Sequence, residues 1–187
     1  MRYNSSVMQK LVSELKTNKV ILRHEGLLVG TIHDVVINPD DGRFLGFIIK
    51  EGFGKGKLKT LAEKDILGFN EQFILIPSYD TLGEIDEIVR IKSVLDQKVS
   101  IIKNKVYTLS GLYLGRVNDF TVDFTSAKLS RLYVDSKSLK NITKDLLIDS
   151  KCIVSIKKDK IVVDDSCVKE PKKSSVDLRT TERGTTC

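Results

Sequence analysis

The stretches "GLLVGTIHD" (residues 26–34) and "GLYLGRVND" (residues 111–119) share the spacing Gly-x3-Gly-x3-Asp, at an offset of 85 residues. Glycines at such spacing either cradle a ligand or shape the backbone. A phosphate-binding glycine loop opens a helix, whereas both stretches lie among the apolar runs of expected strands. The repeat therefore favours structural roles, with Gly26 making a turn and Gly30 letting a strand bend or pack closely.

The similarity between the two halves continues after this motif. At the offset of 85, "FII" (47–49) falls on "LYV" (132–134). A five-residue shortening then gives an offset of 80, at which "FILI" (73–76) falls on "IVSI" (153–156). Because such self-similarity marks a repeated structural unit, the sequence predicts two homologous units.

Each unit is a series of short apolar runs separated by turn residues. The segments at 24–26 and 38–42 contain Gly or Pro, which favour turns. The runs at 73–76 and 161–163 have the length and composition of buried strands. Several short strands at this spacing predict a small antiparallel β-barrel in each unit.

Helical spacing of Ile85, Ile88 and Val89 predicts a connecting helix, and residues 5–15 have a similar pattern. The sequence after residue 168 is polar and predicts disorder. The predicted domains are a first barrel at 1–84, a connecting helix at 85–97, a second barrel at 98–168 and a disordered basic tail at 169–187.

Composition narrows the class of protein. No stretch approaches the roughly 20 apolar residues that cross a bilayer, and the first residues lack the apolar region of a signal peptide. We therefore expect a cytoplasmic protein with no membrane insertion. The three cysteines, Cys152, Cys167 and Cys187, are odd in number and lack the spacing of metal ligands. Neither a metal site nor a disulfide framework is expected.

The net charge of +6 is unevenly distributed: residues 1–84 carry none of it, residues 85–168 carry +4 and residues 169–187 carry +2. A basic second half suits an acidic partner or RNA. The same charge also serves solubility alone, so both readings stay open.

The repeated pattern resembles the PRC-barrel family. The resemblance rests on Gly26, Gly30, Asp34, Gly42, residues 47–49 and residues 65–66 in the first unit, and on Gly111, Gly115, Asp119, residues 132–134 and Asp164 in the second. The second unit departs from the pattern at Ala127, where the family often has a turn glycine.

The resemblance implies a mainly β fold: two small antiparallel β-barrels in tandem, with short helical segments at the N-terminus and between the repeats. Family settings include the cytoplasmic domain of the photosynthetic reaction centre H subunit, the C-terminal domain of a ribosome maturation factor, and adaptors in sporulation or cell division. In these settings the barrel generally docks proteins and does not catalyse reactions.

Several side chains are candidates for chemistry. Asp34 and Asp119 are either catalytic carboxylates or acceptors of backbone N–H groups, and the second reading is favoured because a strand aspartate needs a partner. His24 and His33 are nine residues apart and have no histidine counterparts in the second unit, so surface positions are expected.

The stretch "GFGKGKLK" (52–59) leaves two readings open. Lys55, Lys57 and Lys59 could contact an anion or an acidic partner, or the stretch is simply a hairpin loop. At the offset of 80 the second unit has lost five residues here, which would make the loop particular to the first unit.

The sequence contains no nucleophile–base set, metal quartet or cofactor fingerprint, so we predict no catalytic residue and no cofactor. The predicted function is a non-catalytic adaptor with a protein partner. The alternative is an accessory factor in ribosome maturation or RNA metabolism, against which stands the small number of aromatic residues for base stacking. Homo-oligomerisation stays open.

Overall fold

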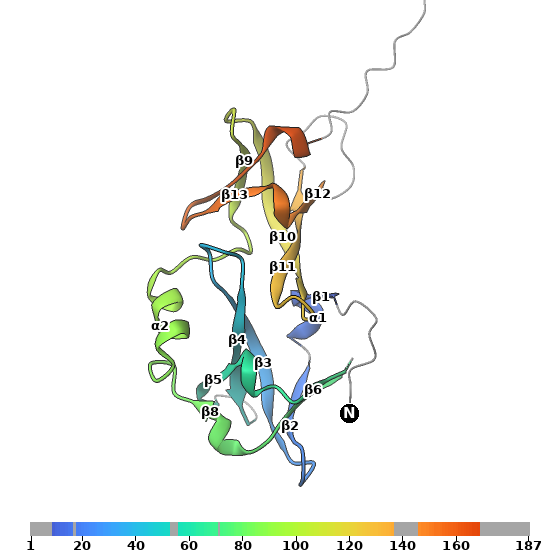
Figure 1. The fold of residues 1–187 in the computed structure, drawn as a ribbon, viewed down its shortest axis with the longest axis vertical. Helices are drawn as coiled ribbons and strands as arrows, with labels where there is room; N and C mark the ends of the chain where they lie inside the picture. Colours follow the sequence, from blue (N-terminus) through green and yellow to red (C-terminus); the bar gives the residue numbers. More distant parts are fainter. Residues whose placement is uncertain (1–8, 17, 53–55, 71, 137–145, 169–187) are drawn as a thin grey trace, which may run out of the picture.

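The computed structural model describes residues 9–16, 18–52, 56–70, 72–136 and 146–168 (Figure 1). They form two β-sheets, one from each predicted unit, together with short helical segments. The predicted fold class is confirmed: the protein is mainly β, and its α-helices lie near the N-terminus and between the units. The tail at 169–187 lies outside the described residues.

The first unit forms one sheet. Its strands are β2 (Lys19–Leu22), β3 (Leu28–Ile37), β4 (Phe44–Glu51), β5 (Leu58–Ala62), β6 (Gly68–Phe69), β7 (Phe73–Ile76) and β8 (Leu82–Gly83), with 3-10 turns η1 (Glu63–Asp65) and η2 (Tyr79–Thr81). The strand order is β6–β7–β2–β3–β4–β5–β8. Neighbouring strands are antiparallel except β2 and β7, which are parallel.

The second unit repeats this plan. Its strands are β9 (Lys105–Thr108), β10 (Tyr113–Asp123), β11 (Lys128–Asp135), β12 (Leu146–Asp149), β13 (Ile153–Ile156) and β14 (Lys160–Val163), with 3-10 turns η3 (Ser150–Cys152) and η4 (Asp165–Cys167). The order is β12–β11–β10–β9–β14–β13, and β9 and β14 form the parallel pair. The predicted repeat is therefore present in the order of six strands, and β8 has no counterpart among the described residues of the second unit.

Strand register corrects the second part of the predicted alignment. Ile48 pairs with Thr60 in the first unit, and its counterpart Tyr133 pairs with Leu147 in the second. The offset consequently rises from 85 to 87, whereas the sequence comparison put it at 80. Eleven residues separate Ile48 from Thr60 and thirteen separate Tyr133 from Leu147, so the second unit is two residues longer between these pairs and the predicted five-residue loss is wrong.

The same register changes the identity of the closing strand. The counterpart of β7 is β14, because each runs parallel to the first strand of its unit. The segment at 153–156 corresponds instead to β6. Short apolar runs resemble one another too closely for composition to choose between β13 and β14.

Two helices flank the first sheet. The expected helix at 5–15 is shorter: α1 spans Val12–Leu15, and the residues before it form β1 (Gln9–Leu11), which pairs with β10 of the second unit. Tertiary pairing here overrides the helical pattern. The expected connecting helix is α2 (Val89–Asp96), which buries Ile91 and Val94 against Val36 and Ile48 of the first sheet. It is therefore packed on the first unit along its length (Figure 1).

The two units meet through their equivalent turns. The Phe44 N–H donates to the Ala127 carbonyl at 2.9 Å, and the Leu129 N–H donates to the Gly42 carbonyl at 2.8 Å. Around this joint one continuous cluster of buried apolar side chains extends from Val12 in α1 to Val163 in β14. The units lie one above the other along the long axis of the molecule in Figure 1.

Candidate interaction surfaces

The motif glycines lie in turns and at close contacts between strands. Gly26 and Gly111 have φ of +64° and +90°, a backbone region that favours glycine in turns. A Cβ at Gly30 would lie 2.3 Å from the Lys50 carbonyl oxygen, and a Cβ at Gly115 would lie 2.0 Å from the Asp135 carbonyl oxygen. The second pair of glycines therefore allows two strands to approach more closely than any side chain permits.

The motif aspartates accept backbone hydrogen bonds. Asp34 Oδ1 accepts the Val35 N–H at 3.0 Å, and Asp119 Oδ1 accepts the Phe120 N–H at 2.8 Å. In each unit this occurs at a bulge, where the ladder register shifts just before the aspartate. Each carboxylate thus fills the gap that the bulge opens in the ladder, which is the arrangement that the structural reading predicts.

Both aspartates also contact the same short helical segment. Asp119 Oδ2 accepts the Ser13 hydroxyl at 2.5 Å, and Asp34 Oδ1 lies 3.4 Å from Lys16 Nζ. The two aspartates, one from each unit, therefore both lie beside α1. Sequence spacing could not show this, since the contact of Ser13 with Asp119 joins positions 106 residues apart.

The two histidines lie on the surface. His24 is in the exposed β2–β3 turn and His33 is exposed at the bulge of β3. Among the described residues, no group of three or more His, Cys, Asp or Glu side chains is arranged to hold a metal ion.

The three loop lysines have different surroundings. Lys55 lies outside the described residues, and Lys57 is exposed. Lys59 Nζ lies 2.5 Å from Glu84 Oε1 in a salt bridge, and this hydrogen bond raises the pKa of Lys59. Lys59 already has an anionic partner within the chain, so contact with an external anion stays a prediction for the other two.

Contrary to the expectation from cysteine number and spacing, Cys152 and Cys167 form a disulfide. Their Cα atoms are 5.9 Å apart because the β13–β14 hairpin brings the end of η3 beside η4. The Asp164 N–H also donates to the Cys152 carbonyl at 2.8 Å. The sequence comparison did not reveal this hairpin, because it aligned residues 153–156 with β7, whose counterpart is β14.

The turn between β9 and β10 is an ordered apolar tip. We use the name apolar tip for residues 108–112, in which Leu109 is 57% exposed and Leu112 is 52% exposed. Thr108 Oγ1 accepts the Leu112 N–H at 3.1 Å, and the Ser110 hydroxyl and N–H both donate to Asp165. The backbone and polar groups are thus held in place while the two leucines face solvent.

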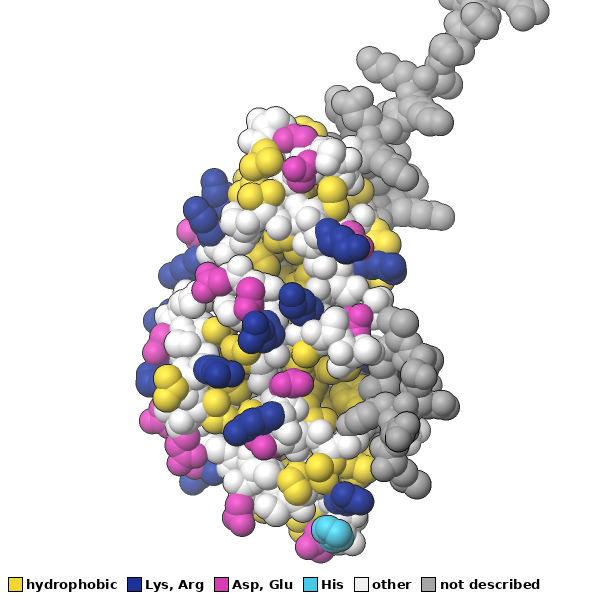
Figure 2. Space-filling model, in the orientation of Figure 1, with side chains coloured by type: hydrophobic (Ala, Val, Ile, Leu, Met, Phe, Trp, Pro, Cys, Tyr) yellow, Lys and Arg dark blue, Asp and Glu magenta, His cyan; other side chains and the backbone are white. Residues whose placement is uncertain are grey.

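Carboxylates border the apolar tip. The hydrogen bond from the Ser110 hydroxyl lowers the pKa of Asp165, and hydrogen bonds from Ser166 lower the pKa of Asp164. Both groups are therefore negatively charged at neutral pH. The upper end of Figure 2 shows yellow apolar side chains beside magenta acidic ones.

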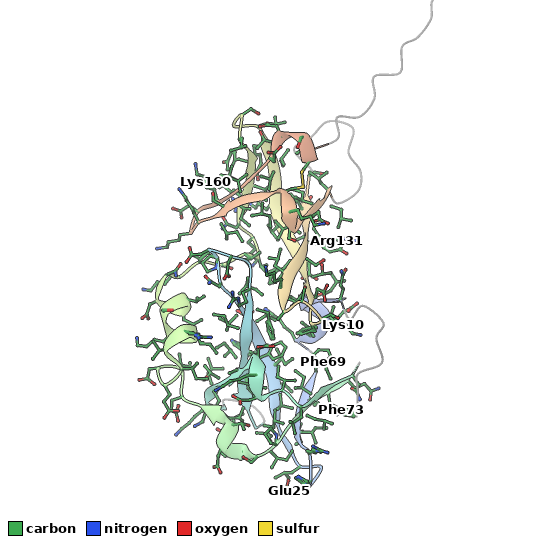
Figure 3. All side chains as sticks on the ribbon, viewed as in Figure 1. Lys10, Glu25, Phe69, Phe73, Arg131 and Lys160 are labelled. Atoms are coloured by element: carbon green, nitrogen blue, oxygen red, sulfur yellow. A yellow bond between two sulfur atoms is a disulfide. The ribbon has the colours of Figure 1, made fainter. Side chains whose placement is uncertain are left out.

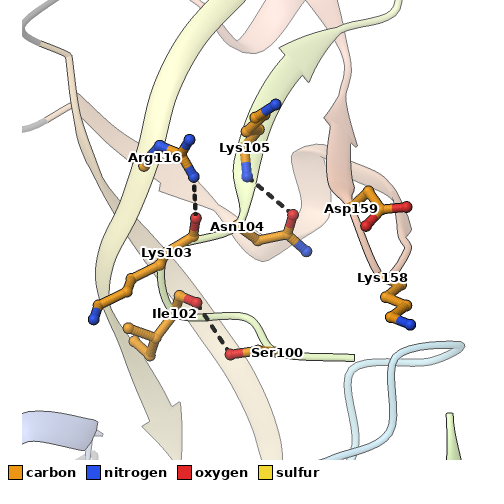
Figure 4. Close-up of a pocket in the computed structure, with 8 residues that line it drawn as sticks. All are labelled: Ser100, Ile102, Lys103, Asn104, Lys105, Arg116, Lys158 and Asp159. Carbon is orange, nitrogen blue, oxygen red and sulfur yellow. Dashed lines mark hydrogen bonds between the residues drawn. The ribbon is translucent and has the colours of Figure 1, made fainter. Parts of the chain in front are cut away.

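A shallow basic hollow of about 290 Å³ lies at the start of β9 (Figure 4). Its cationic lining residues are Lys103, Lys105, Arg116 and Lys158, and Asp159 is the acidic one. Buried Asn104 fixes the walls, because its amide donates to the Lys157 carbonyl at 2.7 Å and its oxygen accepts the Lys105 N–H at 2.9 Å. Arg116 donates to the Lys103 carbonyl at 3.1 Å.

A second hollow, of about 550 Å³, lies at the joint between the units. Its charged lining residues are Asp41, Asp123, Lys128, Arg131, Asp149 and Lys151. Equal numbers of acidic and basic side chains line it, so the hollow does not single out a class of ligand by charge.

The comparison with protein families shows to which family the chain belongs. The PRC-barrel domain model matches twice, over residues 8–98 and 96–166. The chain belongs to the PRC-barrel family. These two matches follow the two units of the structure and confirm the predicted tandem. No curated protein sequence matches the chain. Among the described residues of this PRC-barrel protein, no helix is both long and apolar enough to cross a membrane.

Sequence reasoning missed both surfaces of the second unit, the apolar tip and the basic hollow. Leu109 and Leu112 flank the motif glycine Gly111, and the sequence pattern does not indicate that their side chains are exposed. The cations of the hollow come from the turn before β9, from β9 and β10, and from the β13–β14 turn. Their proximity depends on the parallel pairing of β9 with β14, which no local pattern indicates.

Proposed function

We propose that this tandem PRC-barrel protein is a non-catalytic adaptor that binds a partner protein through the apolar tip of its second unit. The observation that carries the proposal is the exposure of Leu109 and Leu112 on a turn held by hydrogen bonds. An apolar anchor held in place before binding loses little conformational freedom on association. Such anchors contribute much of the affinity in protein interfaces.

The chemistry around the tip defines the partner. Asp164 and Asp165 are ionised at neutral pH, since hydrogen bonds lower the pKa of each. The fitting partner surface is therefore an apolar pocket bordered by Lys or Arg side chains, because complementary charge directs encounter and register. A cytoplasmic location for this complex remains the prediction made from the sequence.

The motif residues support a role without catalysis. The glycines provide turns and close strand contact, and the aspartates accept backbone N–H groups. The residues common to both units are thus used to build the scaffold. Function is then expected on surfaces in which the units differ, as is usual for loops on a shared framework.

The first unit offers a matched control. Leu27 is the counterpart of Leu112 and is 60% exposed, but its turn contains Arg23, His24 and Glu25 where the second unit has the apolar tip. A Leu27→Ser change removes the exposed apolar area of one leucine from the equivalent turn.

The test compares capture by the tagged full chain, by the Leu109→Ser/Leu112→Ser variant and by the Leu27→Ser variant. Proteins recovered by the first and third but not by the second are then purified and titrated by calorimetry. We expect the double variant to weaken binding at least about tenfold, because each buried leucine contributes about 1.5–3 kcal/mol. Equal binding by all three chains, or loss only with Leu27→Ser, would contradict the proposal.

A further inference from the structure

Three cations lie side by side on the outer face of the second sheet. Lys160 of β14 pairs in register with Lys105 of β9, and Lys105 pairs with Arg116 of β10. Register partners share a face of the sheet, and all three side chains are exposed. We call Lys160, Lys105 and Arg116 the cation row. The row ends on β11 at Asp135, the register partner of Arg116.

This arrangement is unfavourable for the isolated protein, because like charges directly opposite on neighbouring strands repel each other. Among the described residues, no salt bridge involves a member of the cation row. Lys103 and Lys158 of the basic hollow add positive charge beside it, and the neighbouring carboxylates are Asp159 of the hollow and Asp135 at the end of the row. Dark-blue side chains lie along the upper-left edge of Figure 2, where Figure 3 labels Lys160.

Two tyrosines lie next to the cation row on the same face. Tyr107 and Tyr113 pair across β9 and β10, with ring centroids 5.2 Å apart, and both are partly exposed. Tyr107 follows Lys105 by two residues, a separation of about 6.6 Å along a strand. A row of cations therefore runs parallel to a pair of aromatic rings.

The first unit lacks this combination. Its counterparts of the cation row are Phe73, Lys19 and Thr31, which pair in the same register and include one cation. In place of the tyrosines it has Ile21 and Leu28. The first unit forms the same strands without the cations or the rings, so the scaffold does not require them. Their presence in the second unit therefore favours a ligand-binding role for this face.

We propose that the outer face of β14, β9 and β10 binds single-stranded nucleic acid, with phosphates at the cation row and bases stacked on Tyr107 and Tyr113. Proteins that bind single strands combine a basic surface along the backbone with aromatic side chains under the bases. The cations alone would be enough to bind a phosphate, and a duplex would keep its bases away from the rings. The presence of the cation row beside Tyr107 and Tyr113 therefore favours a single strand as the ligand.

The test measures fluorescence anisotropy of labelled oligouridylate and oligothymidylate with the full chain over a series of salt concentrations. We expect Lys105→Glu and Arg116→Glu each to lower affinity at least about tenfold. Arg116→Gln should make the slope of log K against log salt less steep by about 0.7, the change for one lost phosphate contact on a single strand. Tyr107→Ala should lower affinity about fivefold or more, whereas Tyr107→Phe retains it.

The matched control is Lys19→Glu, which reverses charge at the position equivalent to Lys105 in the first unit. It should change affinity by less than about twofold, since no cation row surrounds it. Thermal unfolding establishes that each variant is folded. Binding by neither oligonucleotide would overturn the proposal, as would equal losses with Lys19→Glu and Lys105→Glu. Undiminished affinity of Tyr107→Ala, or equal affinity for heparin and duplex, would reduce the face to a general polyanion surface and would also overturn it.

This site does not depend on the adaptor function. Changes in the cation row leave Leu109 and Leu112 in place, and changes of the leucines leave the cations in place. Failure of protein capture and failure of nucleic-acid binding are therefore separate results.

Discussion

Arg43 and Lys128 occupy equivalent positions in the two units and pair with each other in an antiparallel bridge. Hydrogen bonds on either side of the bridge are equivalent as well: Phe44 to Ala127, and Leu129 to Gly42. The turn around Arg43 in the first unit therefore pairs with the equivalent turn around Lys128 in the second unit, and this pairing joins the two units. One continuous buried cluster crosses this joint, so we expect the two units to unfold together.

Phe124 anchors the joint from the second unit. Its ring lies 4.6 Å from Phe69, 5.2 Å from Phe44 and 6.1 Å from Phe47, measured between centroids. Replacing it with alanine should lower the free energy of unfolding by about 2–3 kcal/mol, because apolar contacts are lost and a cavity remains. Urea unfolding followed by circular dichroism measures this. Thr125→Ala, on the exposed neighbour, should change it by less than about 0.5 kcal/mol.

Ala127 adopts a left-handed conformation with φ of +50°, while its counterpart Gly42 has φ of +69°. The turn is thus retained without the glycine that the family often has there, at a steric cost of about 1–2 kcal/mol. Ala127→Gly should raise the free energy of unfolding by about 0.5–1 kcal/mol, since glycine relieves the strain but has a more flexible unfolded state.

The reverse change at the equivalent turn provides the control. A Cβ at Gly42 would meet the Leu129 Cβ at 3.9 Å, an ordinary contact, so Gly42→Ala tests the backbone conformation alone. It should lower the free energy of unfolding by about 1 kcal/mol. Thermal unfolding that moves in the same direction for both variants would contradict the account.

The motif glycines should differ in sensitivity. Gly30→Ala places a Cβ 2.3 Å from a backbone oxygen, so strands β3 and β4 must separate. We expect a loss of about 3 kcal/mol or more in unfolding free energy. At Gly26 no atom lies within 4 Å of a Cβ, and φ is +64°. Gly26→Ala should therefore cost about 1 kcal/mol. Equal losses in chemical denaturation would show that close packing does not distinguish the two positions.

The scaffold could be predicted from the sequence because its determinants are local. Turn glycines, the aspartate at a bulge and the strand pattern repeat in order, and the two copies support each other. The second alignment block failed because "FILI" and "IVSI" are similar in composition, while the correct partner of β7, "KIVV" at 160–163, is set by parallel pairing with β9. The local composition of a strand does not determine which other strand pairs with it.

The candidate sites were less predictable for the same reason. The lysines of residues 52–59 attracted attention as a local cluster, yet Lys59 is paired with Glu84. The cation row draws single residues from three strands, and Lys105 is separated from Lys160 by 55 positions. Low overall aromatic content argued against base stacking, but two of the tyrosines are adjacent in the structure. Clusters of side chains from different strands can be identified only when the pairing of the strands is known.

The apolar tip should depend on pH through Asp165. Hydrogen bonds from Ser110 and Thr108 lower the pKa of this carboxyl from its usual value of 3.8. Stabilisation by the carboxylate is therefore complete above that value and is lost as pH falls through the lower folded-state pKa. Hydrogen exchange of the Ser110 and Leu112 amides should be faster in Asp165→Asn than in wild type at neutral pH.

That difference should disappear in strong acid, where the wild-type carboxyl is protonated. Asp164→Asn is the matched control, because its carboxylate accepts from Ser166 and does not accept from the tip. A difference between Asp165→Asn and wild type that persists unchanged at low pH would contradict the role of the charge.

The disulfide between Cys152 and Cys167 should make stability depend on redox conditions. It closes a loop with a sequence separation of 15, for which the chain-entropy estimate is about 3 kcal/mol. Reductant should lower the midpoint of urea unfolding of wild type and leave that of Cys152→Ser/Cys167→Ser unchanged, since the double variant has no bond to lose. In the unfolded chain, a thiol reagent should detect one group before reduction, Cys187, and three afterwards. Three reactive thiols before reduction in protein purified without reductant would show that the bond does not form, as is usual for cysteines in a reducing cytoplasm.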